Sequence, residues 1–93
     1  FLISSAQIKA ARALLRWSSE DLAMNSGVGS ATVKRVESAS RHGSGRSSTL
    51  LKLQTALESA GVEFTGTDQH KPGVCLDLEK HAAYVEASDH GRG

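Results

Sequence analysis

The chain has 93 residues, of which 39% are hydrophobic and 23% charged, with a formal net charge of +1. This length allows one compact domain with a modest core, and these fractions exclude wholesale disorder. No apolar run approaches the roughly 18 residues that a transmembrane helix needs, and the short apolar start lacks the features of a signal peptide, so we expect no membrane association and a cytoplasmic location.

The charges are divided unevenly along the chain. Residues 1–55 contain eight Lys and Arg against three Asp and Glu, whereas residues 56–93 contain three against seven. A basic half beside an acidic half suggests that the first half faces a polyanion. The single cysteine, Cys75, cannot form an internal disulfide, which fits a reducing compartment, and we expect it to be a buried small apolar residue.

The first predicted helix begins at Ser5, its expected N-cap, and ends at Trp17. It lies in an Ala-rich stretch whose larger apolar side chains are spaced as on one helical face. These apolar side chains are Ile8, Ala11, Leu14 and Leu15. We expect this face to be buried, and Trp17 to close the core between this helix and the next.

Two short helices with a tight turn between them follow. Ser18 and Asp21 form a variant of the capping box that opens the second helix, and Gly27 ends it in a left-handed conformation. The third helix ends near Glu37. The inward side chains of these helices are expected to be Leu22, Ala23, Val28, Val33 and Val36.

The remaining elements change from helix to strand. Residues 38–48 contain two glycines and no large apolar side chain, so they predict an exposed loop. A fourth helix is capped by Ser48, ends at Gly61, and buries Leu50, Leu53, Leu57 and Ala60. Segments 62–65 and 74–78 flank turn-forming residues and predict an antiparallel hairpin. Residues 79–87 favour a short final helix, and residues 88–93 are expected to fray.

The second and third helices carry the spacing of a helix-turn-helix. Ala23, Gly27, Val33 and Val36 stand at relative positions 0, 4, 10 and 13. A small residue at the first position lets the helices cross closely, and the two valines seal the second helix against the first. The opposite face of that second helix is then free to enter the major groove of DNA.

These residues resemble the lambda-repressor-like, or XRE/Cro, helix-turn-helix family. The similarity is clearest over Ile8–Ala23, Gly27–Val28 and Ala31–Glu37, and extends more loosely to Ala60. Segments Ala56–Phe64 and Gly73–Leu76 look like a small bacterial subgroup of regulators that end in a β-hairpin. The resemblance implies a mainly α fold: a four-helix DNA-binding domain in residues 1–61, a hairpin in 62–78, and a short helix or flexible tail in 79–93.

The function implied by the resemblance is that of a sequence-specific transcriptional regulator, expected to be a repressor, that inserts its third helix into double-stranded DNA. In relatives the arginine of the first helix pairs with the glutamate that ends the third, which here joins Arg12 to Glu37 as a structural ion pair. Base edges are expected to meet Ser30, Ala31 and Arg35. Phosphates are expected to meet Ser18, Ser19, Lys34, Arg41 and Arg46.

The side chains expected to face DNA at the start of the third helix are shorter than those common in the family. Relatives commonly carry Gln at the position of Ser19, and a capping Ser or Thr followed by a longer polar side chain where this chain has Gly29 and Ser30. Base readout is therefore expected to be thin, with more of the affinity resting on phosphates. Lys9 and Arg16 are either part of a phosphate-facing stripe or an ordinary solvated face.

The hairpin has two interpretations. Its apolar side chains are Val62, Phe64, Val74 and Leu76. They can bury area against a second copy, giving a homodimer that binds a palindromic operator, or they can fold back on the chain's own helices. We take the dimer interface as the prediction and keep the second interpretation open.

Other kinds of function find little support in the residues. The four histidines and one cysteine are too scattered for a metal site, and no nucleophile or carboxylate pair stands out, so we expect no enzyme, metal or cofactor. The alternative function is that of a protein-interaction module, such as an antitoxin or anti-activator, whose hairpin and acidic tail bind a protein partner.

Overall fold

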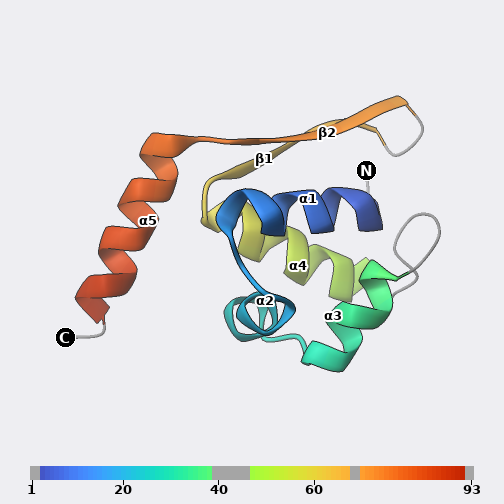
Figure 1. The fold of residues 1–93 in the computed structure, drawn as a ribbon, viewed down its shortest axis with the longest axis horizontal. Coiled ribbons are helices and arrows are strands. Elements are labelled where there is room, and N and C mark those ends of the chain that lie inside the picture. Colours follow the sequence, from blue (N-terminus) through green and yellow to red (C-terminus); the bar gives the residue numbers. More distant parts are fainter. Residues whose placement is uncertain (1–2, 39–46, 68–69, 92–93) are drawn as a thin grey trace.

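The computed structural model describes residues 3–38, 47–67 and 70–91. Over these residues the chain is mainly helical, with one two-stranded antiparallel hairpin between the fourth and fifth helices (Figure 1). The elements are α1 Ser5–Leu15, α2 Ser19–Ser26, α3 Ser30–Glu37, α4 Ser47–Ser59, β1 Val62–Thr67, β2 His70–Leu76 and α5 Leu78–Gly91. Residues 39–46 of the predicted loop, with the phosphate contacts expected for Arg41 and Arg46, lie outside the described residues.

The N-cap of the first helix lies one residue earlier than predicted. Ser4, not Ser5, is the N-cap: its hydroxyl accepts from the Gln7 backbone, and the Gln7 side chain accepts from the Ser4 backbone, which completes a capping box. The helix ends at Leu15 rather than Trp17, because Arg16 takes the left-handed conformation with φ +59°. A serine pair offers two possible caps, and the glutamine three residues after Ser4 selects the first.

The turn around α2 and α3 follows its predicted caps. Ser18 accepts from the Asp21 backbone and donates its own backbone N–H to the Asp21 carboxylate, and Gly27 ends α2 at φ +77°. Gly29 then opens α3 without a side-chain cap. Both helices have only eight residues, so they depend on packing more than on their own hydrogen bonds.

The core joins residues from the first four helices to the start of the hairpin. Its inner side chains have 0–2% of their surface exposed, among them Ile8, Leu22, Val33, Val36 and Leu53. Leu14 was predicted in this core and is instead 42% exposed, whereas Ile3, outside any predicted element, is fully buried. The complete buried cluster is Ile3, Ile8, Ala11, Leu15, Leu22, Val28, Val33, Val36, Leu50, Leu53, Leu57, Ala60 and Val62.

Helix α4 begins at Ser47, one residue before the predicted cap, and leads into a sharp turn at Gly61. Gly61 has φ +107°, and a Cβ added there would lie 2.9 Å from the backbone nitrogen of His81. The turn therefore requires glycine twice, once for its backbone conformation and once for the close approach of α5. It sends the chain back over α1 as a hairpin.

The hairpin pairs Val62 with Leu76 and Phe64 with Val74, and it lies across α1 (Figure 1). Gln7 of α1, only 3% exposed, donates from Nε2 to the carbonyl oxygens of Thr65 at 3.3 Å and Gly73 at 3.1 Å. A buried amide that meets one carbonyl on each strand holds the hairpin against its own chain.

This packing bears on the four hairpin residues predicted at a dimer interface. Val62 is 2% exposed and belongs to the core, while Phe64, Val74 and Leu76 are half-buried against that core. A two-stranded ribbon is marginal in water and needs a surface to cover its apolar face. Here α1 supplies that surface, as in the open interpretation in which the hairpin folds back on its own helices, and a dimer through the half-buried side chains stays a prediction.

Cys75 is exposed, which contradicts its expected burial. It stands opposite Glu63 in the antiparallel register. Alternate residues of a strand point to opposite faces, so a hairpin that buries Val74 and Leu76 must turn Cys75 outward. The type of residue suggested burial, and the register of the strand decides otherwise.

Helix α5 is longer than predicted, reaching Gly91 instead of residue 87. Asp77 opens it, since its carboxylate accepts from the backbone N–H of Lys80 at 3.0 Å. Figure 1 shows α5 standing beside the other helices, at the far side of the molecule from α3. None of the described helices is long and apolar enough to cross a membrane.

Candidate nucleic-acid interface

The outward face of α3 is the first part of the candidate site. Val33 and Val36 are fully buried, which turns the opposite side of this helix to solvent. Ala31, Lys34 and Arg35 are exposed there, and Ser30 is half-buried at the start. The face is short and carries two basic side chains, so it presents positive charge at its end.

An ion pair holds the end of α3 against α1. Arg12 Nε donates to Glu37 Oε2 at 2.6 Å and Arg12 Nη2 donates to Glu37 Oε1 at 3.0 Å. Arg12 Nη1 also donates to the carbonyl oxygen of Trp17 at 2.9 Å. The resemblance implied this pair, and its two parallel bonds give the carboxylate a fixed orientation.

The start of α2 lies beside the same carboxylate. The hydroxyl of Ser19, a half-buried residue, donates to Glu37 Oε1 at 3.4 Å. Ser18 is exposed, but its hydroxyl and backbone N–H are both used in the capping box with Asp21. Both serines that were expected to contact phosphate therefore also make hydrogen bonds within the protein, which position the start of α2 and the end of α3.

Lys34 has a partner that the sequence did not suggest. Its ammonium lies 2.9 Å from Glu20 Oε2, and both side chains are more than half exposed. The hydrogen bond from Lys34 lowers the pKa of the Glu20 carboxyl from its ordinary value of 4.5, with help from a hydrogen bond of the Glu20 backbone and from the lysine charge. No regular spacing links these residues, which meet because α2 and α3 cross.

Arg35 differs from the other cations around α3. Within the described residues the ion pairs are Arg12 with Glu37 and Lys34 with Glu20, so no described carboxylate pairs with Arg35. Its guanidinium is exposed on the outward face. Of the residues expected to touch bases, Arg35 is the one able to make two parallel hydrogen bonds to a base edge.

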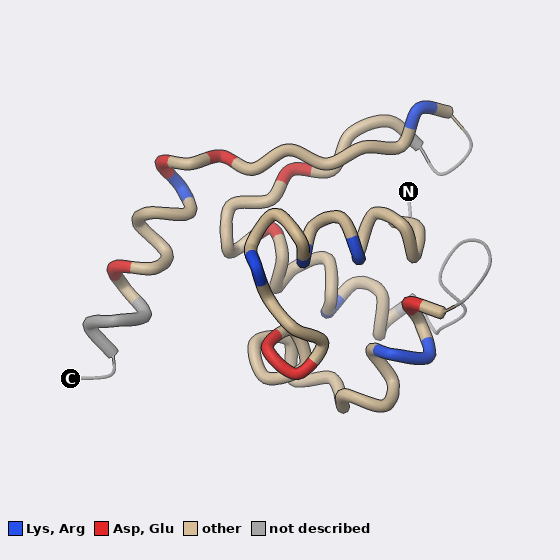
Figure 2. The backbone as a smooth tube through the Cα atoms, in the orientation of Figure 1, with Lys and Arg blue, Asp and Glu red and all other residues tan. Residues whose placement is uncertain are grey.

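The charges of the whole chain are distributed as Figure 2 shows. Among the described residues, most Lys and Arg lie on α1, α3 and α4, whereas Asp and Glu lie at the start of α2, at the end of α3, near the end of α4, on and just after the hairpin, and on α5. Lys9 and Arg16 are exposed on and just after α1. The described basic residues are therefore concentrated in the helical part of the chain that contains α3.

Other classes of site are not formed by the residues the structure describes. These residues bring no three of His, Cys, Asp and Glu together in a group that could hold a metal ion. Every buried side-chain nitrogen or oxygen in the described part of the chain has a hydrogen-bond partner. No family model, no curated protein and no solved structure matches this chain, so its function has to be inferred from its residues and their geometry.

Proposed function

We propose that this chain is a transcriptional regulator that binds double-stranded DNA in a sequence-specific manner. In this proposal α2 and α3 act as a helix-turn-helix of the lambda-repressor type, and α3 enters the major groove. The observation that carries it is the outward face of α3, where Arg35 is exposed and without an ion-pair partner among the described residues.

The contacts are divided between bases and phosphates. Arg35 reads a guanine through O6 and N7, with Ala31 and Ser30 against neighbouring base edges. Lys34, together with Arg41 and Arg46, binds phosphates and supplies affinity that depends on salt. Ser18 and Ser19 lie at the N-terminus of α2, where backbone N–H groups and the helix dipole favour a phosphate.

The regulatory direction is part of the proposal. We propose repression of a nearby promoter, because a helix-turn-helix that occupies an operator blocks the promoter without further chemistry. Such a target places the protein in the cytoplasm of a bacterial cell. The alternative, a protein-interaction module, draws on the acidic hairpin and α5 and is compatible with DNA binding by the other half.

The test compares two neighbouring residues of α3. A duplex is first selected from a random pool, and affinities for it and for a random duplex are then measured at two salt concentrations. We expect Arg35→Ala to weaken the selected duplex by about 1–3 kcal/mol with little effect on the random one. We expect Lys34→Ala to weaken both alike and to reduce the salt slope by about one.

Equal losses for both variants on both duplexes would show that the roles of Arg35 and Lys34 are assigned wrongly. If the wild-type chain enriches no sequence and binds the random duplex only at low salt, the proposal of an operator is wrong. Arg46→Ala, expected to behave like Lys34→Ala, extends the comparison to the segment before α4.

A further inference from the structure

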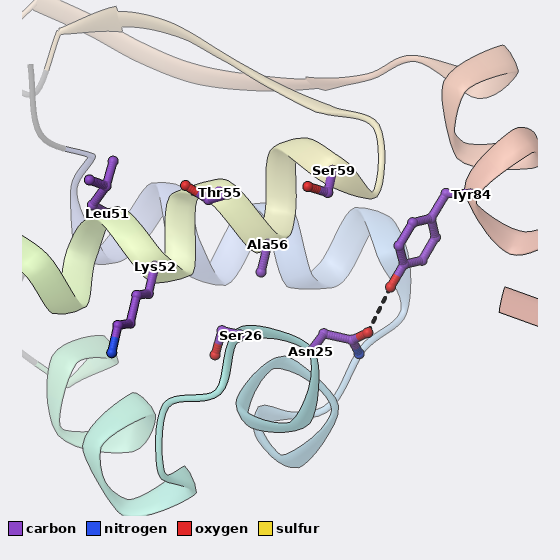
Figure 3. Close-up of a pocket in the computed structure, with 8 residues that line it drawn as sticks. All are labelled: Asn25, Ser26, Leu51, Lys52, Thr55, Ala56, Ser59 and Tyr84. Carbon is purple, nitrogen blue, oxygen red and sulfur yellow. Dashed lines mark hydrogen bonds between the residues drawn. The ribbon is translucent and has the colours of Figure 1, made fainter. Parts of the chain in front are cut away.

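A groove runs between α2, α4 and α5. Its volume is about 360 Å³ and its lining is mostly apolar. Figure 3 shows Leu51, Lys52 and Ala56 along α4, with Asn25 of α2 and Tyr84 of α5 closing one end. The hydroxyl of Tyr84 donates to Asn25 Oδ1 at 2.7 Å across this end.

Exposed apolar side chains gather on the same three helices. Among the described residues five large apolar side chains are exposed, and four of them belong to α2, α4 or α5. They are Met24 at 81%, Leu51 at 59%, Leu78 at 74% and Val85 at 40%. Single exposed apolar residues are ordinary; of these four, Leu51 lines the groove, and Leu78 and Val85 lie on α5, whose Tyr84 forms one of its walls.

Helix α5 contributes an apolar stripe that its own chain leaves uncovered. Leu78, Ala82 and Val85 are spaced four and three residues apart, so they share one face, and all three are exposed. A different face holds α5 to the body: Tyr84 hydrogen-bonds Asn25, and His81 Nδ1 donates to the Ala60 carbonyl oxygen at 2.8 Å.

Within one chain, the apolar stripe of α5 cannot fill the groove. Tyr84 forms a wall of the groove, and its ring lies with its centroid 6.2 Å from that of Trp17. To turn its stripe into its own groove, α5 would have to rotate and break the bonds of Tyr84 and His81. The stripe is thus available to another molecule while α5 stays in place.

The charges beside groove and stripe are opposite. Lys52 lines the groove and has no ion-pair partner among the described residues. Glu79 and Glu86, seven residues apart, are exposed along one edge of the α5 stripe. The α5 stripe and the groove are both apolar, and the glutamates beside the stripe have the opposite charge to the lysine in the groove. The two surfaces are therefore complementary in hydrophobicity and in charge.

We propose that the occupant of the groove is α5 of a second copy of this chain. Each copy carries one groove and one complementary stripe, which is the property of a surface that pairs with itself around a twofold axis. The stripe of one copy then lies over Leu51 and Ala56 of the other, with its glutamates beside Lys52, and the twofold axis repeats the contact. The dimer closes when the two copies are related by this twofold axis, because both grooves and both stripes are then used within the pair.

This dimer does not involve the hairpin face, which is covered by α1. It also does not use α3, since no residue of α3 lines the groove. Dimerisation through α5 does not require DNA binding, so either proposal can fail while the other stands.

The test is the oligomeric state of the full chain, measured by sedimentation velocity from about 1 to about 100 µM. We expect the wild type to be a dimer over this range. Val85→Glu places a carboxylate in the apolar contact and should raise the dimer dissociation constant at least about 100-fold. Lys52→Glu and Glu86→Lys should each raise it about tenfold, since every change occurs twice in the dimer.

The charge pairing has its own control. Combining Lys52→Glu with Glu86→Lys restores opposite charges and should return most of the lost affinity, whereas Lys9→Glu, on α1 and outside the groove, should leave the dimer unchanged. These exposed positions are not expected to affect folding, which circular dichroism verifies. A monomeric wild type, a dimer that survives Val85→Glu, or a double variant no better than the singles would overturn the proposal.

Discussion

At the scale of single residues, the guanidinium of Arg12 makes three hydrogen bonds that join separate elements. One guanidinium binds both oxygens of Glu37 and the carbonyl of Trp17, and so links α1, the turn before α2 and the end of α3. The side chain of Glu37 is 6% exposed and that of Arg12 21%. A carboxylate this buried depends on its partner, because removal from water is costly for an unpaired charge.

Replacing Arg12 with Met should therefore be strongly destabilising. We expect Arg12→Met to lower the free energy of unfolding by about 2–3 kcal/mol, since it strands the Glu37 carboxylate in the protein. Urea unfolding followed by Trp17 fluorescence measures the change. Lys9→Met, which removes an exposed charge from the same helix, is the matched control and should change stability by less than about 0.5 kcal/mol. Equal stability of the two variants would contradict a structural role for the pair.

The Glu20–Lys34 pair predicts a measurable pH dependence. The hydrogen bond from Lys34 lowers the pKa of Glu20 in the folded chain, so the stability that the pair contributes is present above pH 4.5 and is lost as pH falls through the lowered pKa. An NMR titration of the Glu20 side chain should show its midpoint below 4.5, and Lys34→Met should return it towards 4.5. A midpoint unmoved by Lys34→Met, or moved equally by Arg35→Met, would disprove the assignment of the cause.

At the scale of elements, the helix ends are unequal. Helices α1 and α2 begin with complete capping boxes, whereas Gly29 opens α3 with no side chain to accept from the first turn. A Cβ at Gly29 would meet no atom within 4 Å, and its φ is negative, so a side chain fits there. Gly61 is the opposite case, with positive φ and the backbone of His81 in contact distance.

The same substitution at these two glycines should have opposite effects. We expect Gly29→Ser to raise the free energy of unfolding by about 0.5 kcal/mol, because it adds a cap and restricts the unfolded chain. Gly61→Ser should lower it by about 2 kcal/mol or more, because it strains the turn and pushes α5 away. Thermal melts of both variants provide the comparison, and a destabilised Gly29→Ser would show that α3 needs glycine for another reason.

At the scale of the whole molecule, α5 is attached differently from the other helices. Helices α1 to α4 share one buried core, whereas α5 meets the body through the polar and aromatic contacts of His81 and Tyr84. Its half-buried Tyr84 packs on that core from outside. Regional stability follows buried apolar area, so α5 should open at a lower free energy than the rest.

Hydrogen exchange can detect this difference. At concentrations where the chain is monomeric, we expect the amides of α5 to exchange faster than those of α4, whose Leu50, Leu53 and Leu57 are buried. Tyr84→Phe removes the hydrogen bond to Asn25 and should speed exchange in α5 while leaving α4 unchanged. Uniform protection of α4 and α5, or an equal effect of the substitution on both, would contradict the separate attachment of α5.

Much of the helical half was predictable from residues close together in the chain. The box of Ser18 and Asp21, the left-handed Gly27, and the buried valines of α3 are local patterns, since a cap or a helical face involves residues within a turn or two. The hairpin was also predicted, because its alternation and its turn formers are local. The outward position of Ala31, Lys34 and Arg35 follows from the same helical period, although what this face binds remains a proposal.

Tertiary structure alone decided how the elements meet. The strand register turned Cys75 outward, α1 covered the apolar side of the hairpin through Gln7, and the crossing of α2 and α3 joined Glu20 to Lys34. Each of these contacts joins residues that no short-range pattern connects. Local spacing specifies which face of an element is apolar, but which surface covers that face depends on how all the elements pack together.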